Sequence, residues 1–360
     1  MTLGARGAHA ILAVITCATL AACAGRDRPA AGGMTVDLLG AGATFPYPLY
    51  ARWFNQYAAD SGVRINYESI GSGAGIDRLI EGTVDFAATD VPMSDAEIAR
   101  VRGARVLHIP MVLGSVALTY NLPLLERPLR LTPDVIASVF LGEITRWNDQ
   151  RLQAINTGVV LPDEPLRVVH RLDDSGTSYI VSDYLSTVSA SWLAGPGRGK
   201  HVAWPVGAGA RGNEGVAAQV KQTIGAIGFV ESSYARFNRL PTARVRNASG
   251  RFIAPAAFEV AAAAVSVLDT VRQPADLRVS IVNAPGAQAY PIASFSWLLI
   301  APEAISPAKY AQLLRFVEWA VRDGEQMARE LGYEPVPATL AEHVLRSLPA
   351  DAAIPDRLNQ

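Results

Sequence analysis

Cysteine is almost missing from this chain of 360 residues, and histidine is scarce. Both cysteines, Cys17 and Cys23, lie near the N-terminus, so a domain that begins after them contains no disulfide. The five histidines are scattered rather than clustered. We therefore expect neither a metal nor another cofactor, and the sequence offers no nucleophile–base pair for catalysis.

An excess of charge of either sign is also absent. The chain has 32 basic and 33 acidic residues, which excludes the basic surface typical of nucleic-acid-binding proteins. After the N-terminal segment, no uninterrupted apolar run is long enough to span a bilayer; the nearest, residues 258–268, includes Glu259. About 330 residues remain for a soluble globular body, enough for two domains with a substantial core.

The first 22 residues have the pattern of an export signal. Arg6 supplies a weak positive region, and Ala10–Leu20 is apolar but too short to cross a membrane. Leu20-Ala-Ala-Cys23 resembles the lipobox of bacterial lipoproteins, in which the cysteine is lipidated. We predict a lipoprotein signal peptide at residues 1–22 and a lipid-anchored flexible tether at residues 23–35. A secretory signal with an incidental cysteine is the alternative.

Strand-like and helix-like segments alternate along the rest of the chain, which is typical of an α/β fold with crossover helices. The predicted strands are Val36–Leu39, Val63–Tyr67, Phe86–Ala88, Val106–Ile109, Val116–Tyr120, Leu166–Val169, Ile227–Val230 and Trp297–Ile300. Predicted helices follow Pro46 and surround Ile76–Ile80, and others are Pro133–Leu141, Tyr179–Val188, Gly212–Gln222 and Tyr310–Val321. If the last helix packs on the first lobe, two chain crossings form a hinge.

Three short stretches place a hydroxyl residue among glycines just before a predicted helix. They are Gly40-Ala-Gly-Ala-Thr-Phe-Pro46, Gly71-Ser-Gly-Ala-Gly75 and Arg171-Leu-Asp-Asp-Ser-Gly-Thr177. A helix N-terminus carries unpaired N–H groups and a partial positive charge, and glycine lets an anion approach the backbone closely. Taken singly, Thr44 and Ser72 are equally well explained as helix N-caps. Together the three turns favour a tetrahedral oxyanion held by several helix N-termini.

Asp90 lies just past a predicted strand, as Thr44 and Ser72 do, and open α/β sheets bind their ligands at such positions. Taken alone, Asp90 is most simply a turn carboxylate before Pro92. In an anion site it has a specific use, because phosphate still carries a proton near neutral pH that a carboxylate can accept. Sulfate has no such proton and would leave a buried charge unpaired. Asp90 therefore favours phosphate.

Arg171 supplies a guanidinium fork that suits an oxyanion, and Asp173 could orient it. A surface arginine paired with Asp173 or Asp174 is the alternative. Gly207-Ala-Gly-Ala-Arg-Gly212 matches the dinucleotide pattern G-x-G-x-x-G, but it follows only a short segment and has at best Glu231 as its acidic partner. We therefore do not expect a dinucleotide.

These stretches together resemble the phosphate-binding subunits of bacterial Pst ABC transporters. The resemblance also rests on Ile70-Gly-Ser-Gly73, Asp85-Phe-Ala-Ala-Thr-Asp90, Trp204-Pro-Val-Gly207, Gly212-Asn-Glu-Gly215, Gly225-Ala-Ile-Gly-Phe-Val230 and Tyr290-Pro-Ile292. It implies a type II periplasmic-binding-protein fold with two α/β lobes, mixed sheets with flanking helices and a two-crossing hinge. We expect lobe 1 at residues 36–120 and 289–360, and lobe 2 at residues 121–288.

Carried onto matching positions, the resemblance implies a set of phosphate contacts. They are Thr44, Phe45 (through its backbone N–H), Ser72, Asp90, Arg171, Ser175, Gly176 and Thr177, with Asp173 as the partner of Arg171. Two positions depart from the family pattern. Asp174 stands where glycine is usual, so its carboxylate would either weaken binding or point to solvent. Gly73 replaces a hydroxyl residue, which would remove one donor.

The function implied is the capture of inorganic phosphate outside the cytoplasmic membrane and its delivery to an ABC-type import permease, with no chemistry on the ligand. The partners implied are two transmembrane and two ATP-binding subunits, and a lipid at Cys23 would attach the protein to the membrane. Three alternatives remain: a binding protein for sulfate or molybdate, a phosphatase, and a surface phosphate sensor or adhesin without a permease. No nucleic acid is expected as a partner.

Overall fold

The computed structural model describes residues 37–268 and 278–347 of the chain. All of these belong to one compact unit that begins at Thr35. The predicted signal peptide, the lipidation site Cys23 and the tether lie outside the described residues. Within the described ranges, no helix combines the length and the apolar composition needed to cross a bilayer.

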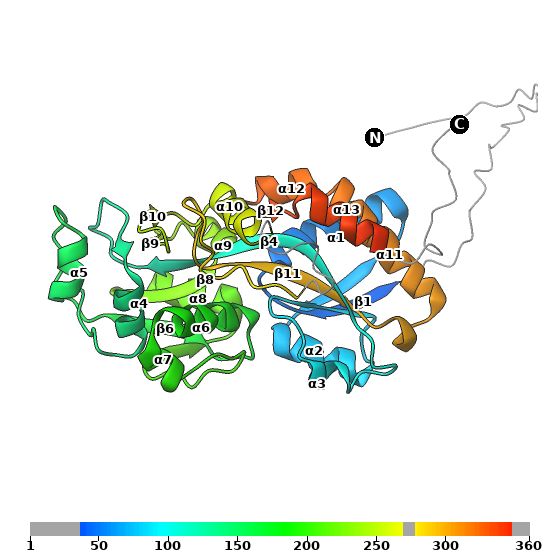
Figure 1. Cartoon of the computed structure of the whole chain (residues 1–360), viewed down its shortest axis with the longest axis horizontal. Coiled ribbons are helices and arrows are strands. Elements are labelled where there is room, and N and C mark those ends of the chain that lie inside the picture. Colours follow the sequence, from blue (N-terminus) through cyan, green and yellow to red (C-terminus); the bar gives the residue numbers. More distant parts are fainter. Residues whose placement is uncertain (1–36, 269–277, 348–360) are drawn as a thin grey trace, which may run out of the picture. The chain divides into compact units, whose positions relative to one another are not determined.

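A nine-stranded mixed sheet forms the centre of the unit, in the order β2-β1-β3-β11-β4-β8-β6-β7 with β12 paired to β4 (Figure 1). Its strands are β1 (Leu38–Gly42), β2 (Ile65–Ser69), β3 (Phe86–Thr89), β4 (Leu107–Tyr120), β6 (Arg167–Arg171), β7 (Ala208–Ala210), β8 (Ala226–Glu231), β11 (Ala293–Ile300) and β12 (Glu334–Pro335). A smaller sheet contains β10 (Phe252–Ile253), β9 (Arg244–Arg246) and β5 (Arg130–Leu131). The predicted α/β fold with mixed sheets is confirmed.

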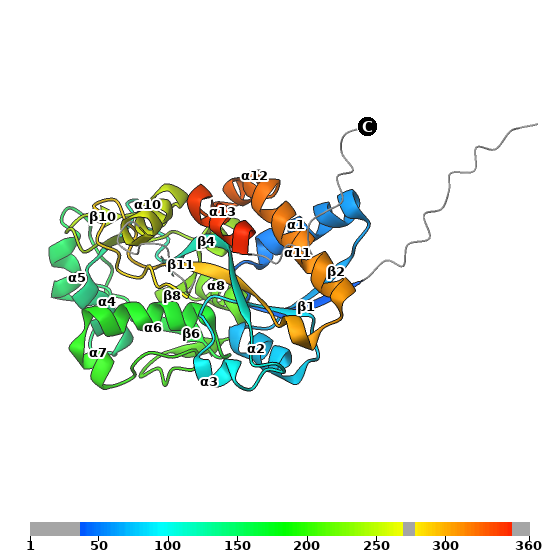
Figure 2. The same ribbon diagram turned by 45° about the vertical axis from the view of Figure 1, so that its right-hand side comes forward.

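Strand β4 lies in the middle of the large sheet and is shared by its two parts. Its residues 107–115 pair with β11, whereas residues 116–120 pair with β8. We call β2, β1, β3, β11 and residues 107–115 the first half-sheet, and residues 116–120, β8, β6 and β7 the second half-sheet. Both views show β4 and β11 running side by side between the two (Figure 2). The boundaries expected for the lobes, at residues 120/121 and 288/289, stay predictions.

The strands predicted at Val106–Ile109 and Val116–Tyr120 are confirmed as extended chain from Leu107 on, but their separation is wrong, because both are parts of a single strand of 14 residues, Leu107–Tyr120. Pro110 cannot donate a ladder hydrogen bond, and the register with β11 shifts beside it, between Ser296 and Trp297. The pairing between β4 and β11 is irregular at this point, and β4 continues through Pro110 without a break. The first strand also differs: β1 is Leu38–Gly42 rather than Val36–Leu39, so it runs into the first glycine turn.

Helices flank the sheet. They are α1 (Tyr47–Ser61), α2 (Ser72–Glu81), α3 (Asp95–Ile98), α4 (Pro133–Phe140), α5 (Gln150–Ile155), α6 (Gly176–Val188), α7 (Ala190–Ala194), α8 (Gly212–Gln222), α9 (Ser232–Phe237), α10 (Ala257–Leu268), α11 (Pro307–Arg322), α12 (Glu325–Glu330) and α13 (Ala338–Ser347), with a 3-10 turn at Pro302–Ala304. Helix α6 begins three residues before its predicted start at Tyr179, because Ser175 caps it. Seven of these helices were not predicted. Five of them, α3, α5, α7, α9 and α12, have four to six residues, too few to show a helical period. The other two, α10 with 12 residues and α13 with 10, were missed although they are longer.

The apolar face of α1 positions the first glycine turn. Trp53, Phe54 and Tyr57 are buried, and their rings contact Phe316 of α11. Burial of each such side chain stabilises the fold by about 1.5–3 kcal/mol. Helix α11, from the last part of the chain, thereby fixes the helix that follows Thr44.

Candidate functional site

The candidate site lies at the carboxyl ends of strands from both half-sheets. Thr44 follows β1, and Asp90 directly follows β3, a parallel neighbour of β1. Arg171 is the last residue of β6 in the second half-sheet. Within each half-sheet, parallel strands bring their carboxyl ends to one edge, so each half gathers site residues that are far apart in the sequence.

Ser72 and Asp90 lie together in the first half of the site. The Ser72 hydroxyl lies 3.4 Å from Oδ2 of Asp90 and accepts the Asp90 backbone N–H at 3.3 Å. The N-cap of α2 is Gly71 with φ 98°, a conformation that favours glycine. The alternative that Ser72 is an N-cap is therefore wrong: Ser72 is the first residue of the helix, and its hydroxyl faces Asp90.

Asp90 is buried, with 2 % of its surface exposed. Burial raises the pKa of its carboxyl from 3.8 to about 7, against the opposing effects of the Ser296 hydrogen bond, the Arg171 charge and the Ser72 hydroxyl. Ser296 of β11 donates to Oδ1 at 2.8 Å. A carboxyl group with this pKa can exchange a proton with a ligand near neutral pH.

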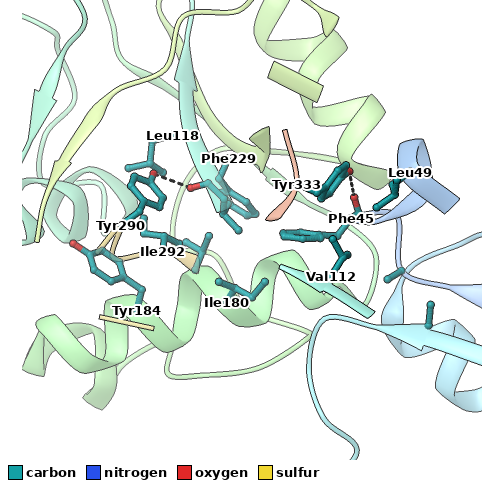
Figure 3. Close-up of a cluster of buried hydrophobic side chains, with 14 of the residues drawn as sticks. Phe45, Leu49, Val112, Leu118, Ile180, Tyr184, Phe229, Tyr290, Ile292 and Tyr333 are labelled. Atoms are coloured by element: carbon teal, nitrogen blue, oxygen red, sulfur yellow. Dashed lines mark hydrogen bonds between the residues drawn. The ribbon is translucent and has the colours of Figure 1, made fainter. Parts of the chain in front are cut away.

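Thr44 and Phe45 form the turn between β1 and α1. Pro46 is the N-cap of α1 and no side chain caps it, so the N-cap alternative for Thr44 is wrong too. Instead, the Thr44 hydroxyl accepts hydrogen bonds from Asn213 of α8. The Phe45 ring lies in the core near Tyr333, whose hydroxyl donates to the Phe45 carbonyl at 2.7 Å (Figure 3). Only the backbone of Phe45 is therefore placed to serve a ligand.

Arg171 and Asp173 form an ion pair in the second half of the site. Arg171 is 3 % exposed, so the alternative of a surface arginine is wrong. Its Nε donates to Oδ1 of Asp173 at 2.9 Å, Nη2 contacts Oδ2, and Nη1 donates to the Thr177 hydroxyl at 3.3 Å. Burial would raise the pKa of Asp173, but the Arg171 hydrogen bonds and charge and the Gly212 N–H together lower it. Asp173 therefore stays ionised and fixes the guanidinium.

The N-terminus of α6 faces Ser72 and Asp90. Ser175 is its N-cap, and the Ser175 hydroxyl accepts the Ser178 N–H at 3.1 Å, so this turn does contain a side-chain cap. At Gly176 an added Cβ would lie 2.5 Å from the Ser72 hydroxyl and 2.7 Å from Oδ2 of Asp90. The cap takes the Ser178 N–H, whereas the N–H groups of Gly176 and Thr177 have no acceptor within the helix and are available to an anion. Gly176 thus allows a contact that any side chain would block.

Several contacts join the two halves around the site. The Gly73 N–H donates to the Asp174 carbonyl at 3.0 Å, and the Tyr234 hydroxyl donates to the Thr44 carbonyl at 2.6 Å. At the rim, Lys200 forms an ion pair with Glu97 of α3. The described arrangement is therefore one in which the halves have closed on each other.

No group of histidine, cysteine, aspartate or glutamate side chains within residues 37–268 and 278–347 is arranged to hold a metal ion. His170, next to Arg171, stacks on Trp204 with ring centroids 5.4 Å apart, and its Nδ1 lies 3.0 Å from the Arg171 carbonyl. This histidine thus serves the packing of the second half.

Comparison with known proteins identifies the family. A family model described as a PBP superfamily domain matches residues 29–324. The phosphate-binding protein PstS of Xylella fastidiosa strain 9a5c is 39 % identical over 311 residues, which cover 86 % of this chain and 84 % of the relative. That of Pasteurella multocida strain Pm70 is 38 % identical over 308 residues, covering 85 % and 88 %. The chain belongs to the PstS family.

A solved structure agrees with the expected fold. The phosphate-binding protein from Stenotrophomonas maltophilia superposes with a TM-score of 0.67 at 19 % identity, covering 86 % of this chain and 93 % of that one. The two-lobe periplasmic-binding-protein fold expected for a PstS family member is confirmed.

The two positions expected to depart from the family pattern, Gly73 and Asp174, lie against each other. An added Cβ at Gly73 would lie 2.4 Å from the Cβ of Asp174, so glycine at position 73 makes room for aspartate at position 174. The Asp174 side chain is 51 % exposed, and Oδ1 lies 3.1 Å from Nδ1 of His201. The Asp174 carboxylate therefore points to the surface, which was one of the two outcomes expected for it.

Sequence reasoning missed three buried polar side chains at the site: Asn213, Ser296 and Glu231. Asn213 bonds Thr44, Ser296 bonds Asp90, and Oε2 of Glu231 lies 2.9 Å from the Tyr333 hydroxyl. The only signal for Asn213 was its place in the stretch Gly212-Asn-Glu-Gly215 that carries the family resemblance. Ser296 lies in a buried strand far along the chain, and no local pattern relates it to Asp90.

Proposed function

We propose that this PstS family member binds inorganic phosphate between its two halves outside the cytoplasmic membrane and delivers it to an ABC-type import permease. The relatives from Xylella fastidiosa and Pasteurella multocida carry the name phosphate-binding protein. The partners would be two transmembrane and two ATP-binding subunits. The contacts would be those carried over from the family: Thr44, Phe45, Ser72, Asp90, Arg171, Ser175, Gly176 and Thr177.

The burial of Asp90 beside the N-terminus of α6 carries this proposal. A site that contains a helix N-terminus and Arg171 attracts an anion, whereas a buried carboxylate repels one that has no proton. Phosphate satisfies both requirements, because it can place one proton between itself and Asp90. Sulfate or molybdate would need Asp90 to be protonated before binding, at a cost that grows as the pH rises above the pKa of about 7.

The available donors are sufficient for useful affinity. Hydrogen bonds that involve a charged group contribute about 1.5–3 kcal/mol each. Three or four of them, after the cost of closing the two halves, give about −8 kcal/mol, or a dissociation constant of about 1 μM.

Attachment to the membrane through a lipid at Cys23 is the second part of the proposal. The Leu20-Ala-Ala-Cys23 sequence supports it, and residues 23–35 would tether the folded unit. A diacylglycerol together with an N-acyl chain would provide the two lipid signals that stable anchoring needs.

Competition between phosphate and sulfate tests the proposal. At about pH 8, titration calorimetry should show phosphate binding that excess sulfate does not reduce. Asp90→Asn should let sulfate compete, because its amide can donate to an anion that has no proton. Asp163→Asn, which changes a carboxylate in an exposed ion pair with Arg146, is the matched control and should leave the selectivity unchanged. If the unmodified protein binds sulfate as well as phosphate, the assignment is wrong.

We also expect no turnover of phosphate esters. A phosphatase needs an activated nucleophile or a metal cluster, and the site supplies hydroxyls that bond Asp90 or Asn213 instead. Hydrolysis of a chromogenic phosphate ester that Ser72→Ala abolishes would contradict this expectation.

A further inference from the structure

Asn213, the second residue of α8, is completely buried and bonds both halves of the site. Its Oδ1 accepts the backbone N–H of Glu231 at 2.8 Å. Because that N–H can only donate, the other end of the amide must be the NH₂ group. Nδ2 lies 2.8 Å from the Thr44 hydroxyl and 3.3 Å from the Thr177 hydroxyl, so each of its two hydrogens has one acceptor.

Counting donors fixes the direction of both hydroxyl groups. A hydroxyl has one hydrogen and two lone pairs. Thr44 Oγ1 receives the side-chain and the backbone N–H of Asn213, and Thr177 Oγ1 receives Asn213 and Nη1 of Arg171. With both lone pairs occupied, each hydroxyl can only donate outward. Within the described residues neither hydroxyl hydrogen has a protein acceptor, although Thr44 is 2 % and Thr177 0 % exposed.

Only the Thr44 part of this arrangement depends on closure, because Thr44 follows β1 in the first half, whereas Asn213, Arg171 and Thr177 all belong to the second. We propose that Asn213 is a positioning residue that makes the Thr177 hydroxyl, and on closure also the Thr44 hydroxyl, a hydrogen-bond donor toward the bound anion. The inference rests on the proposed anion-binding function. It makes Asn213 a residue that touches no ligand but slows its release.

Removal of the amide is the first test. In stopped-flow measurements with inorganic phosphate, Asn213→Ala should raise the dissociation rate about tenfold or more and change the association rate less than about threefold, because the open form lacks the Thr44 contact. The matched control is Asn156→Ala: Asn156 is also buried, and its amide bonds only backbone groups of Arg130 and Leu152. That control should lower thermal stability and leave both rates unchanged.

A double-mutant cycle separates positioning from general support of the fold. In a Thr44→Val/Thr177→Val background there are no hydroxyls to orient, so Asn213→Ala should cost less than about threefold in affinity, against about tenfold in the unmodified background. Asn213→Asp keeps an oxygen that accepts the Glu231 N–H of β8, but it lacks the NH₂ group that donates to Thr44 and Thr177. This variant should therefore keep its contact with β8 and still bind phosphate weakly.

The outcomes distinguish the inference from the function on which it rests. Equal losses for Asn213→Ala in both backgrounds, or unaltered release in the unmodified background, would overturn the role of Asn213 while phosphate binding stands. If the unmodified protein binds no phosphate, the proposed function fails, and the inference fails with it.

Discussion

The two halves of the site each contain a carboxyl group withdrawn from solvent, fully in Asp90 and partly in Asp173, but the two groups behave in opposite ways. Asp90 in the first half is bonded by hydroxyls, and burial raises its pKa to about 7. Asp173 in the second half is bonded by Arg171, which lowers its pKa despite burial. The difference shows that the neighbour decides the charge of a buried acid. In the proposed function, one half would supply a fixed cation, and the other would distinguish anions by their proton.

Removal of the cation should have the largest effect. Arg171→Ala should weaken phosphate binding about 100-fold or more, because it deletes charge-assisted bonds and leaves Asp173 buried without its partner. Calorimetry measures the change, and thermal unfolding checks that the variant folds. Arg171→Lys keeps the charge without the planar fork and should recover only part of the affinity.

The control for this change is Arg146→Ala, which breaks an exposed ion pair of the second half with Asp163. It should leave phosphate affinity within about twofold of the unmodified protein. Similar losses for the two variants would mean that the second half does not attract the anion through a specific cation.

The opposite pKa shifts predict opposite effects of pH on stability. Between its unfolded pKa of about 3.9 and its folded pKa of about 7, Asp90 holds a proton in the folded state that the unfolded chain has released. Stability from Asp90 therefore falls as the pH rises through this window. The lowered pKa of Asp173 gives a contribution that is present above about pH 4 and is lost as the pH falls.

Thermal unfolding in phosphate-free buffer measures this difference. From about pH 5 to about pH 8 we expect the midpoint to fall by several degrees, and Asp90→Asn should remove a large part of that fall. Burial also raises the pKa of Glu231 to about 8, so Glu231→Gln should flatten the upper end of the range. A midpoint that rises over this range would contradict the assigned direction for Asp90.

The rim contact between the halves should have the smallest effect. The side chains of Lys200 and Glu97 are each 23 % exposed, and such pairs contribute about 0.2–1 kcal/mol. Lys200→Ala should raise the phosphate dissociation constant about two- to threefold at low salt, with less effect in high salt. Arg322→Ala removes a pair with Glu318 inside α11 and should not alter affinity. A salt-independent loss for Lys200→Ala would show that the pair does not act by charge.

Local patterns were enough to locate much of the fold and of the candidate site. The stripe of α1 and the bounds of α8 follow from helical periodicity, and the glycine turns lie at strand ends where parallel sheets place ligands. The roles of the hydroxyls could not be read in the same way. A serine or threonine before a helix has the same local pattern whether it caps the helix, as Ser175 does, or faces another residue, as Ser72 does.

Sequence by itself determined the family, the α/β order and the residue types of an oxyanion site, because these depend on neighbours in the chain and on family motifs. Only the tertiary structure decided that β4 is continuous between the halves, that Gly73 makes room for Asp174, and that Asn213 joins Thr44 to Thr177. The last two are contacts between residues far apart in sequence, and the continuity of β4 depends on its pairing with the distant strands β11 and β8. Burial and hydrogen-bond direction arise only when the sheet brings such residues together.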